Sequence, residues 1–308
     1  MKVISLTSEG LTKPEAASAM AIGFFDGVHL GHQQVIKQAK MIAEDNQLKT
    51  AVMTFNPHPK EVLANDKGAV SYLTSMQEKE AIFKALGVDI LYVVSFDIAL
   101  AKLSPSIFVD RFIADLNVKH LICGFDFSYG HMGRGNIHTL VDDSQDRFSV
   151  TIVEKFSERN EKVSSTRIRR MLKDGNVKEA KNLLTRPLRT NGKVVHGHKR
   201  GRTIGYPTAN IEVEPQQALP RTGVYYVTAE IDGEVIHGMA NLGYNPTFED
   251  ELLDVKLEVH FLDYKADLYG KSLAIAWHQF IRPELKFSGV DPLIDQIRQD
   301  EIEIRQLY

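Results

Sequence analysis

The first half of the chain alternates short apolar runs with longer stretches in which apolar residues recur every three or four positions. The apolar runs, each typical of a buried strand, are residues 18–25, 49–55, 90–96 and 120–127. The stretches with helical spacing are residues 31–46, 75–87 and 104–116. This alternation predicts a parallel sheet covered by helices, with ligands bound where strands end and helices begin.

After about residue 186 the runs become shorter and richer in β-branched residues, as in 223–243. Within that run, Asp232 and Gly233 predict a tight hairpin turn. We expect a compact β-barrel, closed by an amphipathic helix in 290–308. The predicted domains are 1–184, α/β with a parallel sheet, and 185–308, a β-barrel with a terminal helix.

The composition is that of an ordinary globular protein, with 43% hydrophobic and 25% charged residues. A net charge of −3 argues against nucleic acid as a partner, so any anion must bind at a local site. The single cysteine, Cys123, excludes an intrachain disulfide or a multi-cysteine zinc site. The sequence shows no signal-peptide core and no run near the ~18 apolar residues that span a bilayer. We expect a cytoplasmic protein without a membrane partner; its oligomeric state is left open, weak self-association included.

Two histidines, His29 and His32, follow the first predicted strand where a helix is expected to begin. Residues three apart share one face of a helix, so both imidazoles can converge beside an N-terminus, whose N–H groups attract phosphate. Gly23 and Gly31 let the backbone approach such a ligand closely. We expect the pair to bind a triphosphate and to stabilise charge during attack on its α-phosphorus. The simpler alternative is that one histidine caps the helix and the other is exposed.

Three further segments of the first domain carry candidate binding residues. Residues 54–63 form a proline-rich loop after a strand, 123–136 combine aromatic rings with glycines, and 163–172 begin a helix with hydroxyls and arginines. These features suit a pocket wall, a planar ring near a phosphate, and a phosphate clamp. The candidate residues are Asn56, His58, Asp126, Phe127, Tyr129, Ser165, Thr166 and Arg169. Taken alone, the segments also fit a stiff turn, an anchored loop and a helix N-cap.

The second domain begins with a basic segment, residues 186–205, that contains no acidic residue. Its glycines let the chain fold over a polyphosphate, with backbone N–H groups supplying much of the binding. The candidate nucleotide-binding residues are Gly201, Arg202 and Gly205. The alternative is a solvated basic loop.

A short strand follows this loop and carries candidate metal ligands. Thr208 and Asn210, two residues apart, point to one side and offer neutral oxygens to Mg²⁺ already held by phosphates. Phosphoryl transfer to an alcohol also needs a base. Glu258 is the candidate, because burial among its β-branched and apolar neighbours raises the pKa of a carboxyl group. The alternative is a glutamate on the exposed face of a strand.

The segments of the first domain resemble a known family. "GFFDGVHLGHQ", "TFNPHP", "GFDFSYG" and "SSTRIR" are similar, in order and spacing, to the N-terminal module of prokaryotic bifunctional riboflavin kinase/FMN adenylyltransferases. "GRTIGYPTANI", "GMANLGYNPTF", "LEVHFLD" and "RPELKF" resemble the riboflavin kinase module of that family. The resemblance covers almost the whole chain. It implies a Rossmann-like nucleotidyltransferase domain followed by a riboflavin kinase barrel.

The resemblance also implies the chemistry. The second domain would phosphorylate riboflavin to FMN, and the first would adenylylate FMN to FAD with release of pyrophosphate, both with ATP and Mg²⁺. His29 and His32 would bind ATP phosphates, and Glu258 would activate the ribityl hydroxyl. The residues at positions that the family uses for flavin or nucleotide are Asp126, Ser165, Thr166 and Arg169; those for Mg-ATP are Thr208 and Asn210.

Three positions depart from the family pattern. Thr185 and Leu188 stand where many members have glycine and tyrosine, and His198 stands where many have aspartate. All three border the expected ATP loop of the kinase. One alternative is therefore an FMN adenylyltransferase with a weak or inactive kinase domain. A more remote alternative is a flavin-sensing regulator without enzymatic activity.

Overall fold

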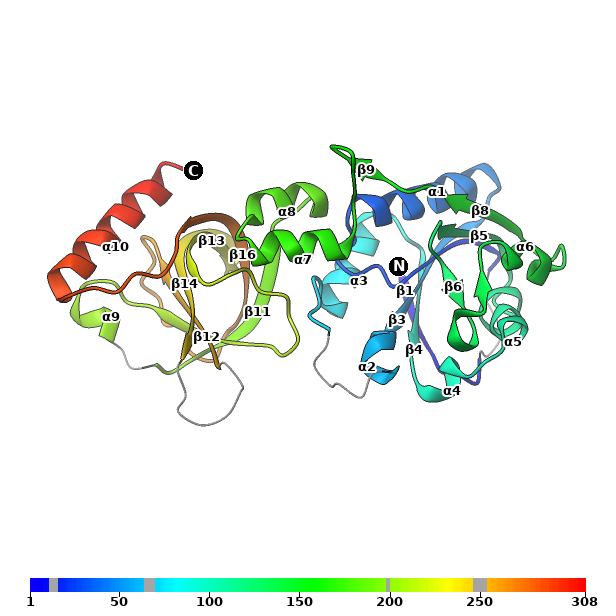
Figure 1. Ribbon diagram of the computed structural model, residues 1–308, viewed down its shortest axis with the longest axis horizontal. Coiled ribbons are helices and arrows are strands. Elements are labelled where there is room, and N and C mark those ends of the chain that lie inside the picture. The colour runs from blue at the N-terminus through cyan, green and yellow to red at the C-terminus, as the bar shows by residue number, and fades with distance from the viewer. Residues whose placement is uncertain (11–15, 64–69, 198–199, 246–253) are drawn as a thin grey trace. The chain divides into compact units, whose positions relative to one another are not determined.

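The computed structural model describes residues 1–308 apart from 11–15, 64–69, 198–199 and 246–253. The described chain forms two compact units, Met1–Ser165 and Thr166–Tyr308 (Figure 1). None of the helices in its described part is long and apolar enough to cross a membrane.

A six-stranded parallel sheet forms the centre of the first unit. Its strands, in spatial order, are β1 (Lys2–Leu6), β4 (Ile90–Ser95), β3 (Lys49–Asn56), β2 (Ser18–Ile22), β5 (Val118–Gly124) and β8 (Ser149–Val153). The helices that pack on the sheet are α1 (Leu30–Asp45), α3 (Met76–Ala85) and α5 (Pro105–Val109), which continues into a π-helical turn (Asp110–Ala114). Successive residues of the buried β2 enter two different hydrophobic cores, one with α1 and α3 and one with α5.

The order of the strands reverses at β2, which pairs with β3 on one side and β5 on the other. Ligands bind at such a switch point, beyond the carboxyl ends of the two strands. The short elements that follow the strands are α2 (Pro59–Leu63), α4 (Ile98–Ala101), β6 (Ser128–Tyr129), a 3₁₀ turn (His131–Gly133), β7 (Gly135–Asn136), α6 (Thr139–Ser144), β9 (Ser157–Glu158) and β10 (Glu161–Lys162).

The second unit is a closed barrel of six antiparallel strands. Their order around the barrel is β11 (Leu188–Val195), β12 (Ala209–Val213), β15 (Asp254–Phe261), β14 (Glu234–Asn245), β13 (Gly223–Ile231) and β16 (Ser272–Arg282). Its helices are α7 (Ser165–Lys173), α8 (Val177–Leu184), α9 (Arg200–Thr203) and α10 (Val290–Arg305). Trp277 is fully buried in the barrel, where its Nε1–H donates to Oγ1 of Thr190 at 2.8 Å.

An α/β unit followed by a barrel with a terminal helix confirms the predicted fold class. The hairpin is also confirmed, because Ile231 pairs with Glu234 and the turn residues Asp232 and Gly233 have φ angles of 53° and 88°. The sequence pattern does not predict β1 and β8. Both are edge strands with partly exposed residues, so they lack the continuous apolar run of the inner strands.

The two helices that precede the barrel in sequence, α7 and α8, pack with the barrel. The backbone N–H of Arg221 donates to the oxygen of Leu172 in α7 at 2.9 Å, and α8 packs against β16. The predicted junction at 184–185 assigns both helices to the first domain, whereas the compact units divide after Ser165. The boundary between the two domains at 184–185 therefore stays a prediction.

Thr185 ends α8 in the left-handed conformation, with a φ of 63°. We expect Thr185→Gly to raise the free energy of unfolding by roughly 0.5 to 1 kcal/mol, because relief of left-handed strain exceeds the entropic cost of glycine. Urea unfolding followed by the fluorescence of Trp277 measures this in the second unit. As a matched control, Lys178→Gly in the exposed face of α8 should lower stability by about 1 kcal/mol. A stability for Thr185→Gly at or below that of the wild type would contradict the strain argument.

Candidate active sites

The two predicted histidines lie together at the start of α1. His29 is the N-cap, and its Nδ1 accepts a hydrogen bond from the backbone N–H of His32 at 3.3 Å. The two rings are stacked, with centroids 3.6 Å apart. A Cβ at Gly31 would crowd the His29 ring, so glycine leaves room for this cap. The capping interpretation is correct for His29, but His32 is packed against it and is not fully exposed.

Both imidazoles are neutral near pH 7. Burial lowers the pKa of His29 from 6.5 to about 4. Burial also lowers the pKa of His32 well below 6.5, with further contributions from His29, Lys79 and Lys162. Because Nδ1 of His29 accepts a hydrogen bond, its proton lies on Nε2, which is therefore a donor. Nδ1 of His32 is buried and has no hydrogen-bond partner in the described chain, as expected beside a ligand site.

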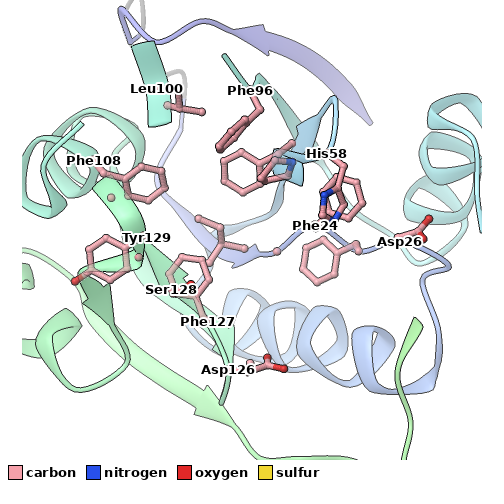
Figure 2. Close-up of a pocket in the computed structure, with 18 of the residues that line it drawn as sticks. Phe24, Asp26, His58, Phe96, Leu100, Phe108, Asp126, Phe127, Ser128 and Tyr129 are labelled. Carbon is pink, nitrogen blue, oxygen red and sulfur yellow. The ribbon is translucent and has the colours of Figure 1, made fainter. Parts of the chain in front are cut away.

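A cavity of about 570 Å³ adjoins His32 beyond the ends of β2 and β5. This volume is typical of small-molecule sites. Figure 2 shows rings from several elements directed at one space. The aromatic residues in its wall are Phe24, Phe25, Phe55, Phe96, Phe108, Phe127 and Tyr129. Such rings give the flat apolar contact that suits a planar ring system.

Most of the residues predicted to bind flavin lie in this wall. Those that line the cavity are His58, Asp126, Phe127 and Tyr129. Asn56 is exposed at the end of β3, and the adjacent Phe55 lines the cavity there. Gly23, predicted to contact nucleotide, also lines the cavity. Contact of these residues with a flavin or nucleotide stays a prediction.

Residues near the end of the first unit approach the same cavity. Ser165 lines it, and its hydroxyl donates to the backbone oxygen of Asp26 at 2.9 Å. Lys162 in the β9–β10 hairpin pairs with Asp126 at 2.7 Å. The remaining predicted residues of this segment, which follow in α7 and belong to the second unit, are Thr166 and Arg169. Their contact with nucleotide also stays a prediction.

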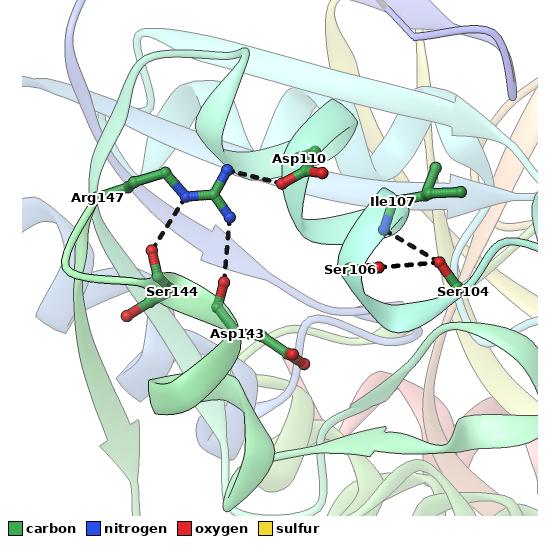
Figure 3. Close-up of polar contacts among 7 residues, drawn as sticks. All are labelled: Ser104, Ser106, Ile107, Asp110, Asp143, Ser144 and Arg147. Atoms are coloured by element: carbon green, nitrogen blue, oxygen red, sulfur yellow. Dashed lines mark hydrogen bonds and ion pairs between the residues drawn. The ribbon is translucent and has the colours of Figure 1, made fainter.

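Tyr129 is held in the cavity wall by α6. Its hydroxyl donates to the carboxylate of Asp143, and burial and this contact raise the pKa of the phenol. Arg147 in turn donates to the backbone oxygens of Asp143 and Ser144, each at 3.1 Å (Figure 3). It also pairs with Asp110 in the π-helical turn at 2.6 Å. These contacts hold one wall of the cavity in a fixed position.

A second cavity, of about 600 Å³, lies in the second unit between the barrel and α10. Glu258 of β15 lines it and is directly opposite Asn210 of β12 and Asn241 of β14. Its neighbours Leu257 and Val259 are buried, so the Glu258 side chain lies on the other face of the strand. Its side chain is 24% exposed and pairs with Lys256 at 2.9 Å. Glu258 therefore lies on the face of its strand away from the buried residues, as the simpler alternative expects, but it is only partly exposed there.

The predicted metal ligands lie beside Glu258. Thr208 lines the cavity, and the preceding Pro207 oxygen accepts a hydrogen bond from Nδ1 of His260 at 2.7 Å. The side chain of Asn210 packs so closely on Gly197 that a Cβ there would overlap its amide. Neutral oxygens at these two positions fit a metal that arrives with its phosphates. Among the described residues, no cluster of three acidic, histidine or cysteine side chains forms a cage for a metal.

The basic loop before β12 is described in part. Gly201 lines the second cavity, and its oxygen accepts a hydrogen bond from the backbone N–H of Tyr206 at 2.9 Å. Gly205 has a φ of 85°, which favours glycine. Arg202 lies in α9, and His198 lies outside the described residues.

The two other departures from the family pattern lie in the framework of the second unit. Thr185 ends α8, and Leu188 is buried in β11 opposite Trp277. Neither is among the residues that line the second cavity.

The far wall of the second cavity comes from α10. Asp300 is buried and accepts hydrogen bonds from Nε and Nη2 of Arg282 at 2.7 to 2.9 Å. Gln296 donates to the same carboxylate at 2.8 Å. This paired contact fixes α10 to the end of β16, and both members line the cavity.

Several residues of the two sites do not stand out in the sequence. Asn241 meets Glu258 only through the pairing of β14 with β15. Lys256 lies two residues before Glu258 on the same strand and therefore on the same face, which the sequence could have indicated. Asp26 and Lys79 adjoin the histidine pair, but Lys79 has the surroundings of an ordinary surface lysine in a helical pattern. Its burial depends on contact with a distant loop.

Both halves of the chain match models of known families. Residues 11–167 match the FAD synthetase model, and residues 184–308 match the riboflavin kinase model. The chain belongs to the bifunctional riboflavin kinase/FMN adenylyltransferase family. The match of both halves favours two activities over adenylyl transfer alone.

Similar proteins extend over nearly the full chain. The bifunctional riboflavin kinase/FMN adenylyltransferase of Listeria monocytogenes is 50% identical over 94% of this chain and 92% of its own length. That of Bacillus subtilis is 45% identical over 98% of this chain and 97% of its own length. A crystal structure of a macrolide-efflux protein from Streptococcus pneumoniae superimposes with a TM-score of 0.88, at 36% identity and 99% coverage of both chains.

The lowered pKa of His29 predicts a titration far from that of an exposed imidazole. Because burial disfavours the charged form, the ring should stay neutral between pH 5.5 and 7.5 and take up its proton near pH 4. Histidine ring NMR signals of the ligand-free protein, assigned with a His29→Gln variant, measure this directly. A midpoint near 6.5 would contradict the buried, neutral donor.

Proposed function

We propose that this chain converts riboflavin to FAD in two ATP-dependent steps. The second unit transfers the γ-phosphoryl group of ATP to riboflavin, which gives FMN and ADP. The first unit transfers the adenylyl group of a second ATP to FMN, which gives FAD and pyrophosphate. One observation carries the proposal: each family-matched unit holds its own cavity of a volume typical of small-molecule sites, with a predicted catalytic residue, His32 or Glu258, in its wall.

In adenylyl transfer, an FMN phosphate oxygen attacks the α-phosphorus of ATP, and the bond to the bridging oxygen breaks. Negative charge accumulates on the departing pyrophosphate. The first turn of α1 and the Nε2–H of His29 supply hydrogen-bond donors for that charge, and His32 contributes the second imidazole. The aromatic wall, with Phe24 and Tyr129, holds the flavin ring so that its phosphate reaches the histidines.

In the kinase step, the ribityl hydroxyl of riboflavin attacks the γ-phosphorus. The Glu258 carboxylate accepts the proton of that hydroxyl, and ADP leaves. Lys256, 2.9 Å from Glu258, orients the carboxylate. Mg²⁺ bound with ATP would neutralise phosphate charge, and Thr208 and Asn210 would hold it through their neutral oxygens.

A cytoplasmic location and the absence of a nucleic-acid or membrane partner stay predictions.

The test is a chromatographic time course with ATP and Mg²⁺, started either from riboflavin or from FMN. FAD should form from both, with FMN as an intermediate from riboflavin. Glu258→Gln should slow FMN formation roughly 100-fold or more and leave FAD formation from FMN unchanged. His32→Gln should slow FAD formation to a similar degree and leave the kinase unchanged.

Each variant is thus the control for the other. Loss of both activities in one variant would indicate misfolding, which circular dichroism detects. If FMN alone is converted by the wild type, the kinase assignment is wrong. If neither substrate gives FAD, the proposed function is wrong.

A further inference from the structure

Lys79 is a buried lysine in α3 that the proposed chemistry does not use. It is 2% exposed, and its Nζ donates to the backbone oxygen of Phe24 at 2.9 Å. The same ammonium group lies 4.1 Å from the centroid of the Phe24 ring. Burying an ammonium group costs desolvation free energy, so these contacts must offset a substantial penalty.

Phe24, which Lys79 contacts, belongs to a loop with a strained backbone. Residues 23–29 connect β2 to α1, and within them Phe25 and Val28 have φ angles of 53° and 39°. Left-handed backbone is unfavourable for both of these side chains and persists only where surrounding contacts hold it. Phe24 directly precedes Phe25 in this turn and lines the first cavity.

Two donors from different elements meet at the Phe24 oxygen. Oγ1 of Thr54, at the end of β3, donates at 2.9 Å, and Lys79 donates at 2.9 Å from α3. The next residue but one, Asp26, is also tied from outside the loop, since both of its carboxylate oxygens accept from the backbone N–H of Leu73, at 3.0 and 3.2 Å. The loop is therefore fixed to three separate segments of the first unit.

The charge of Lys79 also reaches the histidine pair. Burial lowers the pKa of Lys79 to about 8, while the negative charge of Asp26 opposes that fall, so the ammonium group is largely charged at pH 7. Its positive charge in turn contributes to the lowered pKa of His32. Lys79 thus acts on the loop through the Phe24 carbonyl, and on His32 in the first turn of α1 through its electric field.

We propose that Lys79 is a positioning residue for adenylyl transfer. By fixing the Phe24 carbonyl and ring, it keeps Phe24 and the His29–His32 pair in a constant arrangement at the first cavity. This inference rests on the proposed function of the first unit. Lys79 is not among the residues that line the first cavity, so it acts through the loop. A side chain with one fixed donor and one face-on ring contact has the rigidity that such a role requires.

The test compares Lys79→Met, Lys79→Arg and Lys84→Met in the full chain. Lys84 is an exposed lysine of the same helix and supplies the matched control. We expect Lys79→Met to lower kcat/KM for FAD formation roughly 100-fold, the loss typical of a site displaced by about 1 Å. Lys79→Arg should recover at least a tenth of the wild-type value, because it keeps the charge and donor. Lys84→Met should match the wild type.

The kinase of the same polypeptide separates positioning from general damage. FMN formation from riboflavin should stay within about 2-fold of wild type in all three variants, because the second cavity is built from other residues. Equal loss of both activities in Lys79→Met would overturn the inference in favour of a purely structural lysine. Unchanged FAD formation in Lys79→Met would overturn it directly.

A binding measurement makes the test independent of turnover. The dissociation constant for FMN, from quenching of flavin fluorescence, should rise in Lys79→Met and not in Lys84→Met. If the wild-type chain forms no FAD, the proposed function fails, and FMN binding alone then decides the positioning role. An FMN affinity equal to that of the wild type in Lys79→Met would then overturn it.

Discussion

The hydrogen bond from the backbone N–H of His32 to Nδ1 of His29 sets the geometry of the first site. It begins α1 at a defined residue, because one of the orphan N–H groups of the first turn is satisfied. It selects the tautomer of His29 and brings the two rings into a stack. The strand ends at the switch point next to β2 supply the cavity, and the cap places His32 in its wall.

In the proposed function each unit holds a flavin beside phosphates, and the two units bring their site residues together in different ways. In the first, loops after parallel strands converge at one edge of a sheet, so residues far apart in sequence meet there. In the second, Asn210, Glu258 and Asn241 are direct partners on three adjacent strands, so the register of the barrel alone aligns them. The first site depends on loop contacts, and the second depends on strand pairing.

This difference explains how far the sequence could predict each site. His29 and His32 were predictable because a strand, glycines and a helix start are encoded within a few residues. Glu258 was predictable as a residue type, but its alignment with Asn210 and Asn241 depends on strand pairing that no local pattern specifies. Lys79 was not predictable, because its burial arises from contact with Phe24, 55 residues away. Edge strands such as β1 were not predicted for a related reason, because their exposed residues interrupt the apolar run that marks a buried strand.

The neutrality of the stacked histidines also affects how product leaves the first site. A fixed cation in this place would attract the pyrophosphate product as strongly as the ATP from which it came, and would hold it after transfer. Neutral N–H donors give directional hydrogen bonds with little long-range attraction, so they lose less free energy when the polyanion departs. In the proposed reaction, the burial that keeps these imidazoles uncharged thereby favours the release of product at each turnover.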